Sequence, residues 1–161
     1  IPAKKISTNK NIFIKIKKFF NTNELSNFEN AAFFNNSKVK RLQYKWHKES
    51  SYYKTKSDII TLWYPWINNA NKNNGTMIMA KDSHKKNFEY RVIKKKNHLT
   101  QMEINERNFK SRDMVYCNLK LGDAVIFSSK CAHKTGNNLT NKSRITMISR
   151  YTDCETIINN L

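Results

Sequence analysis

Three residues of this sequence have the types and the spacing of a metal site. His47 and Glu49 are separated by one residue in the stretch YKWHKES (44–50), and a second histidine, His133, follows the apolar run AVIFSS. On a β-strand, side chains two residues apart project from the same face. The imidazole of His47 and the carboxylate of Glu49 are therefore either two ligands of one metal or two polar groups on a solvated sheet surface.

Two histidines and one carboxylate form the facial triad of non-haem Fe(II) oxygenases, which leaves positions open for a bidentate co-substrate and O2. Arg144 lies beyond His133, at the start of the alternating segment SRITMISRYT. A guanidinium group binds a carboxylate through two parallel hydrogen bonds. The His-x-Glu pair alone is a weak signal, but its combination with a distant His and an Arg predicts an Fe(II) site beside a carboxylate-binding arginine.

Short strands are expected to position these residues. Segments rich in β-branched and aromatic residues, separated by turn residues, predict an all-β sandwich or jelly roll; they cover residues 41–46, 58–66, 76–80, 113–121, 124–129 and 143–152. The polar stretch 84–112 is expected to be a lid-like insertion. We therefore predict a single domain over 1–161, with a flanking segment at 1–40 and a core at 41–152.

The flanking segment is rich in Lys and Asn. The run IFIKIKKFF (12–20) is amphipathic and fits a strand or a short helix, whereas NTNELSNFENAAFFNN (21–36) predicts one short helix capped by Thr22 or Asn23. The sequence begins without Met and without the pattern of a signal peptide, so we interpret it as a fragment or a trimmed chain.

The composition excludes several classes of protein. Apolar residues make up 39% of the 161 residues, and only 3 Gly and 2 Pro occur, which indicates a packed domain rather than a Pro/Gly-rich disordered chain. No apolar run is long enough for a transmembrane helix. Three widely spaced cysteines without a CxxC motif indicate reduced thiols and a cytoplasmic protein. Cys131 leaves open a Cys-x-His zinc site with His133.

The formal net charge of +18 is compatible with nucleic acid, an anionic membrane surface or an anionic substrate. Lys dominates over Arg, and Asn is frequent, which is the composition expected of an AT-rich coding sequence. Proteins that read nucleic-acid bases use Arg more often than Lys. A basic nucleic-acid-binding β domain therefore stays the less favoured alternative, and a small anionic molecule is the preferred partner.

Several motifs together resemble the phytanoyl-CoA dioxygenase family. They are WHKES, LWYPW, NNGTMIMAKDSHK and LKLGDAVIFSSKCAHKTGNNLTNKSRITMISRYT, in the family's order and spread over about residues 41–152. The resemblance implies a double-stranded β-helix (a cupin-like jelly roll) with a few flanking helices. It also implies an Fe(II)- and 2-oxoglutarate-dependent dioxygenase that uses O2, hydroxylates a small molecule and releases succinate and CO2.

The resemblance assigns roles to seven residues. It places His47, Glu49 and His133 on the metal, and it places four residues around 2-oxoglutarate: Arg144, Thr135, Trp63 and Gln43. Arg144 and the Thr135 hydroxyl would hold the distal carboxylate of 2-oxoglutarate. Related halogenases replace the metal-binding carboxylate with a small residue, so a carboxylate at this position favours hydroxylation.

Three features depart from the family pattern. Glu49 stands where Asp is usual, Lys81-Asp82 stands where Pro-Gly is usual, and much of the N-terminal helical part is missing. These departures keep open a second interpretation, a jelly-roll binding protein that is catalytically inactive or binds another metal. The substrate and the oligomeric state are not specified by the sequence.

Overall fold

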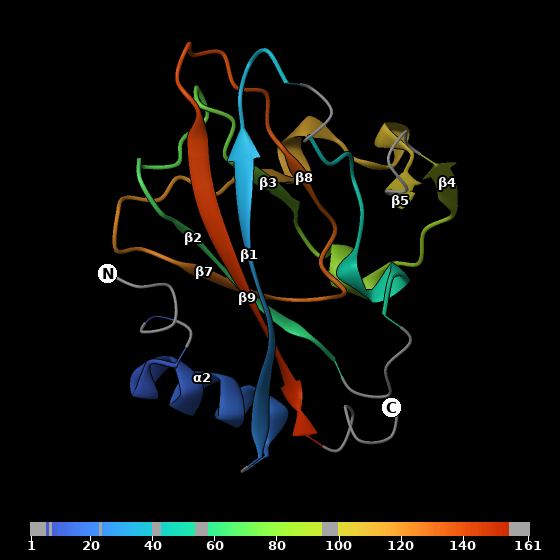
Figure 1. The fold of residues 1–161 in the computed structure, drawn as a ribbon. Coiled ribbons are helices and arrows are strands. Elements are labelled where there is room, and N and C mark those ends of the chain that lie inside the picture. The colour runs from blue at the N-terminus through green and yellow to red at the C-terminus, as the bar shows by residue number, and fades with distance from the viewer. Residues whose placement is uncertain are drawn as a thin grey trace.

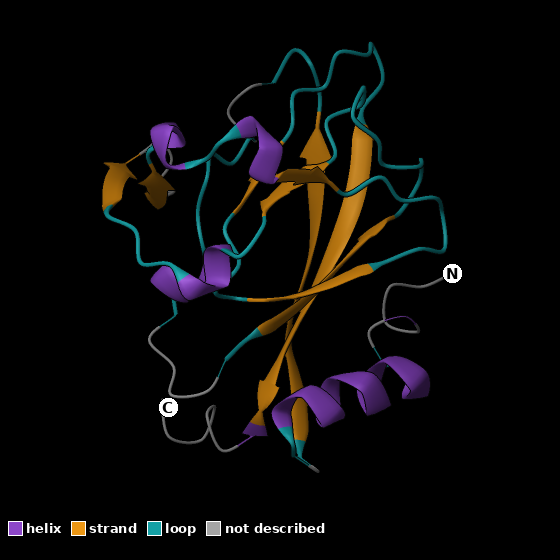
Figure 2. Cartoon of the chain, turned by 180° about the vertical axis from the view of Figure 1, so that it is seen from behind, coloured by secondary structure: helices purple, strands orange, loops and turns teal. Residues whose placement is uncertain are grey.

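Two antiparallel β-sheets face each other in this chain, with a helix on the outer side and a hairpin at one edge (Figures 1 and 2). The computed structural model describes residues 6, 8–22, 24–39, 43–53, 58–94 and 100–154. The predicted all-β jelly-roll core with a few flanking helices is confirmed. In the described part of the chain, no helix is both long and apolar enough to cross a membrane.

The larger sheet has four strands in the order β1-β9-β2-β7, which are β1 (Leu25–Asn35), β9 (Arg144–Asp153), β2 (Ile60–Pro65) and β7 (Val125–Ser128). The smaller sheet has the order β6-β3-β8, with β6 (Met114–Tyr116), β3 (Met77–Ala80) and β8 (His133–Thr135). The strands predicted at 58–66, 76–80, 124–129 and 143–152 are thus confirmed, and the one at 113–121 is shorter than expected.

Side chains of strand β9 project from both faces of the larger sheet. Its alternate residues from Arg144 to Arg150 line the interior between the sheets, whereas Tyr151 packs on the outer side. This alternation follows from the period of two along a strand. The inner face therefore carries the polar residues of the candidate site, and the outer face carries part of the core.

Helix α2 (Lys10–Phe20) covers part of that outer face (Figure 1). It begins at Asn9, whose side chain accepts hydrogen bonds from the backbone N–H groups of Asn11 and Ile12, and it ends at Asn21 in the left-handed conformation. Its fully buried residue, Ile16, packs with strand β2 residues. The amphipathic run at 12–20 is therefore a helix, one of the two predicted options.

Two local predictions are wrong. The segment expected to hold a helix at 21–36 forms strand β1, which pairs antiparallel with β9 from Leu25 to Asn35 with one irregularity near Asn27. The larger sheet therefore extends N-terminal of residue 41. The strand expected at 41–46 does not form in residues 43–46, which have no regular structure. For β1, the tertiary pairing with β9 rather than the local propensity decides the conformation.

The insertion at 84–112 is more regular than expected. It contains the hairpin β4 (Tyr90–Lys94) and β5 (Thr100–Ile104) and the short 3-10 helices η3 (Ser83–Lys85), η4 (Glu106–Asn108) and η5 (Ser111–Asp113). The backbone N–H of Ile104 donates to the Trp46 carbonyl at 2.7 Å, and the Trp46 and Phe109 rings stack at 4.1 Å. The insertion is thus joined to the segment that carries His47.

Candidate metal centre

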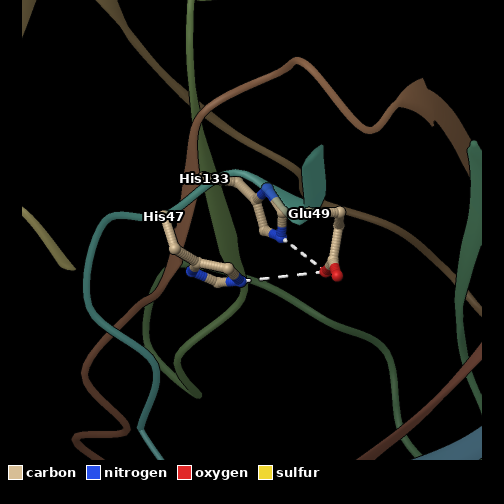
Figure 3. A group of neighbouring side chains, drawn as sticks. All are labelled: His47, Glu49 and His133. Carbon is tan, nitrogen blue, oxygen red and sulfur yellow. Dashed lines mark ion pairs between the residues drawn. The ribbon is translucent and has the colours of Figure 1, made fainter. Parts of the chain in front are cut away.

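The side chains of His47, Glu49 and His133 converge on one point (Figure 3). The Nε2 atoms of His47 and His133 lie 3.8 and 3.5 Å from the Glu49 Oε1 atom, and the candidate ligand atoms all lie within 4.8 Å of one another. All three residues are buried. The structure thus brings together the three residues that the sequence analysis placed on a metal.

Backbone pairing sets the positions of the two histidines. The N–H of each donates to the carbonyl of the other at 3.0 Å, which forms an isolated β-bridge between His47 and strand β8. Glu49 begins the 3-10 helix η2 (Glu49–Ser51), and the next residue, Ser50, donates its N–H to the Ser129 carbonyl at 3.1 Å. His47 and Glu49 therefore do not project from one continuous strand; a β-bridge and a helical turn orient the pair.

The other ring nitrogen of each histidine is engaged by the backbone. His47 Nδ1 lies 2.7 Å from the Lys45 carbonyl, and His133 Nδ1 lies 3.0 Å from the Cys131 carbonyl. A neutral imidazole that donates from Nδ1 presents an unprotonated Nε2. Such hydrogen bonds typically orient histidines that bind metals. Both Nε2 atoms therefore face the Glu49 carboxylate, where they donate when protonated and offer a lone pair to a metal when Nδ1 carries the single proton of the ring.

The surroundings of Glu49 and His133 shift the pKa of each group. Burial would raise the pKa of Glu49, but hydrogen bonds with His133 and His47, together with the charge of Arg150, hold it well below its ordinary value. Burial and the neighbouring His47 lower the pKa of His133, against the opposing effect of Glu49. Near neutral pH, Glu49 is therefore ionised and His133 is neutral.

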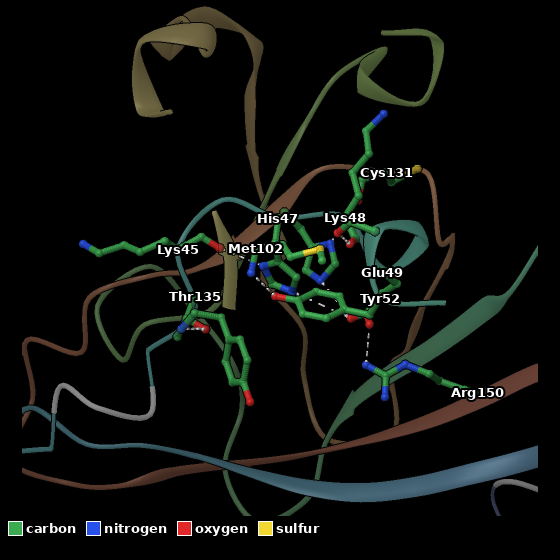
Figure 4. Close-up of polar contacts among 12 residues, drawn as sticks. Lys45, His47, Lys48, Glu49, Tyr52, Met102, Cys131, Thr135 and Arg150 are labelled. Atoms are coloured by element: carbon green, nitrogen blue, oxygen red, sulfur yellow. Dashed lines mark hydrogen bonds and ion pairs between the residues drawn. The ribbon is translucent and has the colours of Figure 1, made fainter. Parts of the chain in front are cut away.

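Arg150 is a site residue that the sequence analysis missed. Its Nη2 atom lies 2.8 Å from Glu49 Oε2 (Figure 4). Its Nη1 atom lies 2.6 Å from Glu29 Oε1. The Tyr53 hydroxyl donates to the other oxygen of Glu29 at 2.7 Å. The spacing from Arg144 to Arg150 is even, so the strand period already placed the two side chains on the same face of β9. Nothing local in β1 pointed to Glu29.

Arg144 lies in the same cavity and is only 4% exposed. Its Nε donates to the Gly75 carbonyl at 3.1 Å, its Nη1 donates to the Thr146 hydroxyl at 2.8 Å, and its guanidinium lies 5.5 Å from the centre of the Trp63 ring. Among the described residues, no carboxylate pairs with Arg144, and burial lowers its pKa to about 10. A buried guanidinium without an acidic partner suits an anionic ligand.

The Arg144 environment depends on Gly75, which has a φ of 76°. The Gly75 carbonyl accepts hydrogen bonds from both Arg144 Nε and Asn35 Nδ2. A Cβ at this position would collide with the Asn35 side chain and would lie 2.6 Å from the Gly136 carbonyl oxygen. Gly75 therefore allows the close packing that holds Arg144 in the cavity.

The cavity between the sheets has a volume of about 280 Å³. Six of the seven predicted site residues line it: His47, Glu49, Trp63, His133, Thr135 and Arg144. Gln43 is partly buried but is not among the lining residues. Lining residues that the sequence analysis missed include Glu29, Phe33, Tyr44, Tyr52, Thr61, Phe127, Lys134 and Arg150.

Two other predicted features can be placed. Cys131 is absent from the candidate metal cluster and contributes only its backbone carbonyl, which His133 Nδ1 contacts. Asp82, at the position where the resemblance has Gly, has a φ of 53°. Asp tolerates this left-handed region better than most residues. The run Lys94-Lys95-Lys96 lies largely outside the described residues.

The comparisons with known proteins establish the family and the fold. The sequence model of the family described as phytanoyl-CoA dioxygenase (PhyH) matches residues 9–146. A search of curated proteins gives no match. Among solved structures, EvdO2 from Micromonospora carbonacea var. aurantiaca complexed with 2-oxoglutarate has a TM-score of 0.72 at 16% identity and covers 86% of this chain.

Two further structures share the fold. ThoJ, described as a non-heme monooxygenase, has a TM-score of 0.74 at 18% identity and covers 94% of this chain. The epimerase SnoN in complex with Fe3+, alpha ketoglutarate and nogalamycin RO has a TM-score of 0.70 at 15% identity and covers 93%. The chain spans 56%, 55% and 58% of EvdO2, ThoJ and SnoN, respectively.

Proposed function

Because the chain belongs to the phytanoyl-CoA dioxygenase family, we propose that it is an Fe(II)- and 2-oxoglutarate-dependent oxygenase that hydroxylates a small molecule. The observation that carries this proposal is the convergence of two imidazole nitrogens and one carboxylate oxygen in a cavity that also contains Arg144. Two histidines and one carboxylate are the ligand set of this class of oxygenase. The formal charge of +18 favours an anionic substrate.

Different residues would bind the metal and 2-oxoglutarate. His47, Glu49 and His133 would hold the metal, and Arg144 would pair with the distal carboxylate of 2-oxoglutarate. The Thr135 hydroxyl accepts a hydrogen bond from the Tyr44 N–H at 3.2 Å, so its own proton is available for the same carboxylate. Trp63 would form a wall of the co-substrate site. Gln43 has no role in this proposal because it does not line the cavity.

The bound Fe(II) would couple the oxidative decarboxylation of 2-oxoglutarate by O2, which yields succinate and CO2, to oxidation of the substrate. Trp63 and Phe127, which are more than nine-tenths buried, line the cavity in which that chemistry would take place. A carboxylate ligand at Glu49 favours hydroxylation over halogenation. Epimerisation, the activity in the description of SnoN, is the alternative outcome that product analysis would distinguish.

The experiment that tests this function is an anaerobic titration of the apoprotein with Fe(II) and 2-oxoglutarate. We expect the visible metal-to-ligand charge-transfer absorption of the chelate in the wild type and its loss in Glu49→Ala. In Arg144→Ala, a higher concentration of 2-oxoglutarate should be needed to produce the same absorption. Arg112→Ala is a matched control because its side chain is 78% exposed. Folded protein that binds Fe(II) and 2-oxoglutarate without this absorption, or that binds neither, would contradict the proposal.

The same protein can then be screened with small anionic molecules by measuring succinate release. A substrate that gains one oxygen atom per succinate supports hydroxylation. A product of unchanged composition and inverted stereochemistry would show that the reaction is epimerisation rather than hydroxylation.

A further inference from the structure

We propose that Arg150 is a positioning residue that orients the Glu49 carboxylate for metal binding, and that Glu29 balances the charge of Arg150 so that a cation can bind nearby. This inference rests on the proposed function, because it concerns the same metal site. It assigns a role to a three-residue ion network, Glu29–Arg150–Glu49, that the motifs of the sequence did not identify. Arg150 and Glu49 are buried, and Glu29 is partly exposed.

The two oxygens of Glu49 have different partners (Figure 4). Oε1 faces the Nε2 atoms of His47 and His133 at 3.8 and 3.5 Å, whereas Oε2 lies 2.8 Å from Arg150 Nη2. Because Arg150 engages one oxygen, the other is directed towards the two imidazoles. The contact therefore selects a carboxylate orientation in which a single oxygen of Glu49 is presented to a metal.

A glutamate needs this restraint more than an aspartate does. Its additional methylene adds a rotatable bond, and fixing that bond costs conformational entropy. Glu49 begins a short 3-10 helix rather than a continuous strand, so the local backbone does not restrain the side chain by sheet pairing. The contact with Arg150 fixes the carboxylate from strand β9, on the opposite side of the cavity.

Arg150 is itself held in place. Its Nη1 atom lies 2.6 Å from Glu29 Oε1, its guanidinium lies 5.8 Å from the centre of the Tyr53 ring, and the Tyr53 hydroxyl donates to Glu29 Oε2 at 2.7 Å. Arg150 is 7% exposed. One guanidinium group thus connects strand β1, strand β9 and helix η2. Because its donors are held in a planar, rigid arrangement, it fixes Glu49 relative to the two strands.

The charges explain why Glu29 belongs to the network. An arginine next to a metal ligand would repel a divalent cation. Glu29 offsets this charge, so that Glu29, Arg150 and Glu49 together carry the same formal charge as Glu49 alone. Replacing both Glu29 and Arg150 with neutral residues therefore changes the orientation of Glu49 without changing the net charge beside the metal.

The test is a Co(II) titration of the apoprotein without O2, 2-oxoglutarate or substrate, with a competing chelator to measure affinity. We expect Glu29→Gln/Arg150→Gln to bind Co(II) about 10- to 100-fold more weakly than the wild type, the range typical for loss of groups that orient metal ligands. The control Arg112→Gln, at an exposed arginine, should bind as the wild type does. Circular dichroism and thermal unfolding would verify that each variant folds.

A second variant keeps the test decisive if the double variant does not fold. Arg150→Lys preserves the charge but removes the two-pronged donor geometry, and we expect Co(II) affinity about 10-fold below the wild type. The network can also be tested in a Glu49→Asp background, in which the shorter side chain loses contact with Arg150. In that background the Glu29→Gln/Arg150→Gln pair should weaken Co(II) binding by less than about threefold, which gives a measurable coupling between Glu49 and the network.

The outcomes separate the inference from the proposed function. If the wild type binds Co(II), and either the folded double variant or Arg150→Lys binds it equally well, the positioning role is refuted and the metal site stands. The role is also refuted if the double change weakens binding equally in the wild-type and Glu49→Asp backgrounds. If the wild type binds no Co(II), the proposed function fails and the inference fails with it.

Discussion

Replacing Arg144 with Met should weaken 2-oxoglutarate binding strongly and change the free energy of unfolding of the apoprotein only slightly. Burial lowers the Arg144 pKa to about 10, which corresponds to about 3 kcal/mol of unfavourable free energy for the charged guanidinium. The hydrogen bonds to Gly75 and Thr146 offset part of that cost. Since no described carboxylate pairs with Arg144, the apoprotein retains a charge that is only partly compensated.

The carboxylate of 2-oxoglutarate would supply the missing counter-charge. Removing one partner of a buried, hydrogen-bonded charge pair costs about 2–5 kcal/mol of binding free energy, so Arg144→Met should weaken 2-oxoglutarate binding by about 30- to several-thousand-fold. Met approximates the length of the aliphatic part of Arg and can pack against Trp63. The free energy of unfolding of the apoprotein should therefore change by less than about 1.5 kcal/mol.

Two measurements on the same preparation test this reasoning. Isothermal titration calorimetry of the Co(II)-loaded protein gives the 2-oxoglutarate affinity, and urea denaturation of the apoprotein gives the free energy of unfolding. Arg112→Met, at an exposed arginine, controls for the loss of one positive charge. A 2-oxoglutarate affinity within about threefold of the wild type, or a loss of more than about 3 kcal/mol in apoprotein stability, would show that Arg144 is a structural residue rather than a ligand-binding one.

Three further predictions follow from the geometry. Gly75→Ala should destabilise the protein by at least about 2 kcal/mol, since alanine at a φ of 76° is strained and its Cβ would meet Asn35; an unchanged midpoint of urea denaturation would contradict this. His133→Ala should weaken Co(II) binding by at least about 100-fold, since one of three ligands is lost, whereas the exposed His84 replaced by Ala should bind as the wild type does. The pKa of His133 is lower in the folded state than the ordinary value of 6.5, so the unfolded chain binds the proton first and the stability of the apoprotein should fall as the pH is lowered below 6.5. Urea denaturation at several pH values between about 7.5 and 5.5 should show that the free energy of unfolding depends less on pH in His133→Ala than in the wild type. An equal dependence on pH in both proteins would refute this.

Strand β9 shows which parts of the fold can be predicted from sequence. Its alternation is a local property, since side chains two residues apart share a face whatever the strand pairs with. The segment 143–152 was therefore predicted as a strand, and the structure has it at Arg144–Asp153. The buried strand β2 was predicted from another local property, its β-branched and aromatic residues.

Strand β1 shows where local reasoning fails. Its sequence, LSNFENAAFFN, contains Ala, Asn and Glu, which have little intrinsic preference for strands. It forms a strand because it pairs with β9, more than a hundred residues later in the chain. A partner at that distance cannot be identified from the local pattern, so a helix was predicted instead.

The amino-acid sequence was sufficient to indicate which chemistry is available. The residue types and order of His47, Glu49, His133 and Arg144 already predicted a metal site with a carboxylate-binding arginine, because ligand preference depends on side-chain type. How those groups meet depends on the packing of distant segments. The β-bridge between His47 and His133 and the contact from Arg150 to Glu49 join distant segments, and contacts of that kind depend on how the strands pair and pack rather than on any local pattern.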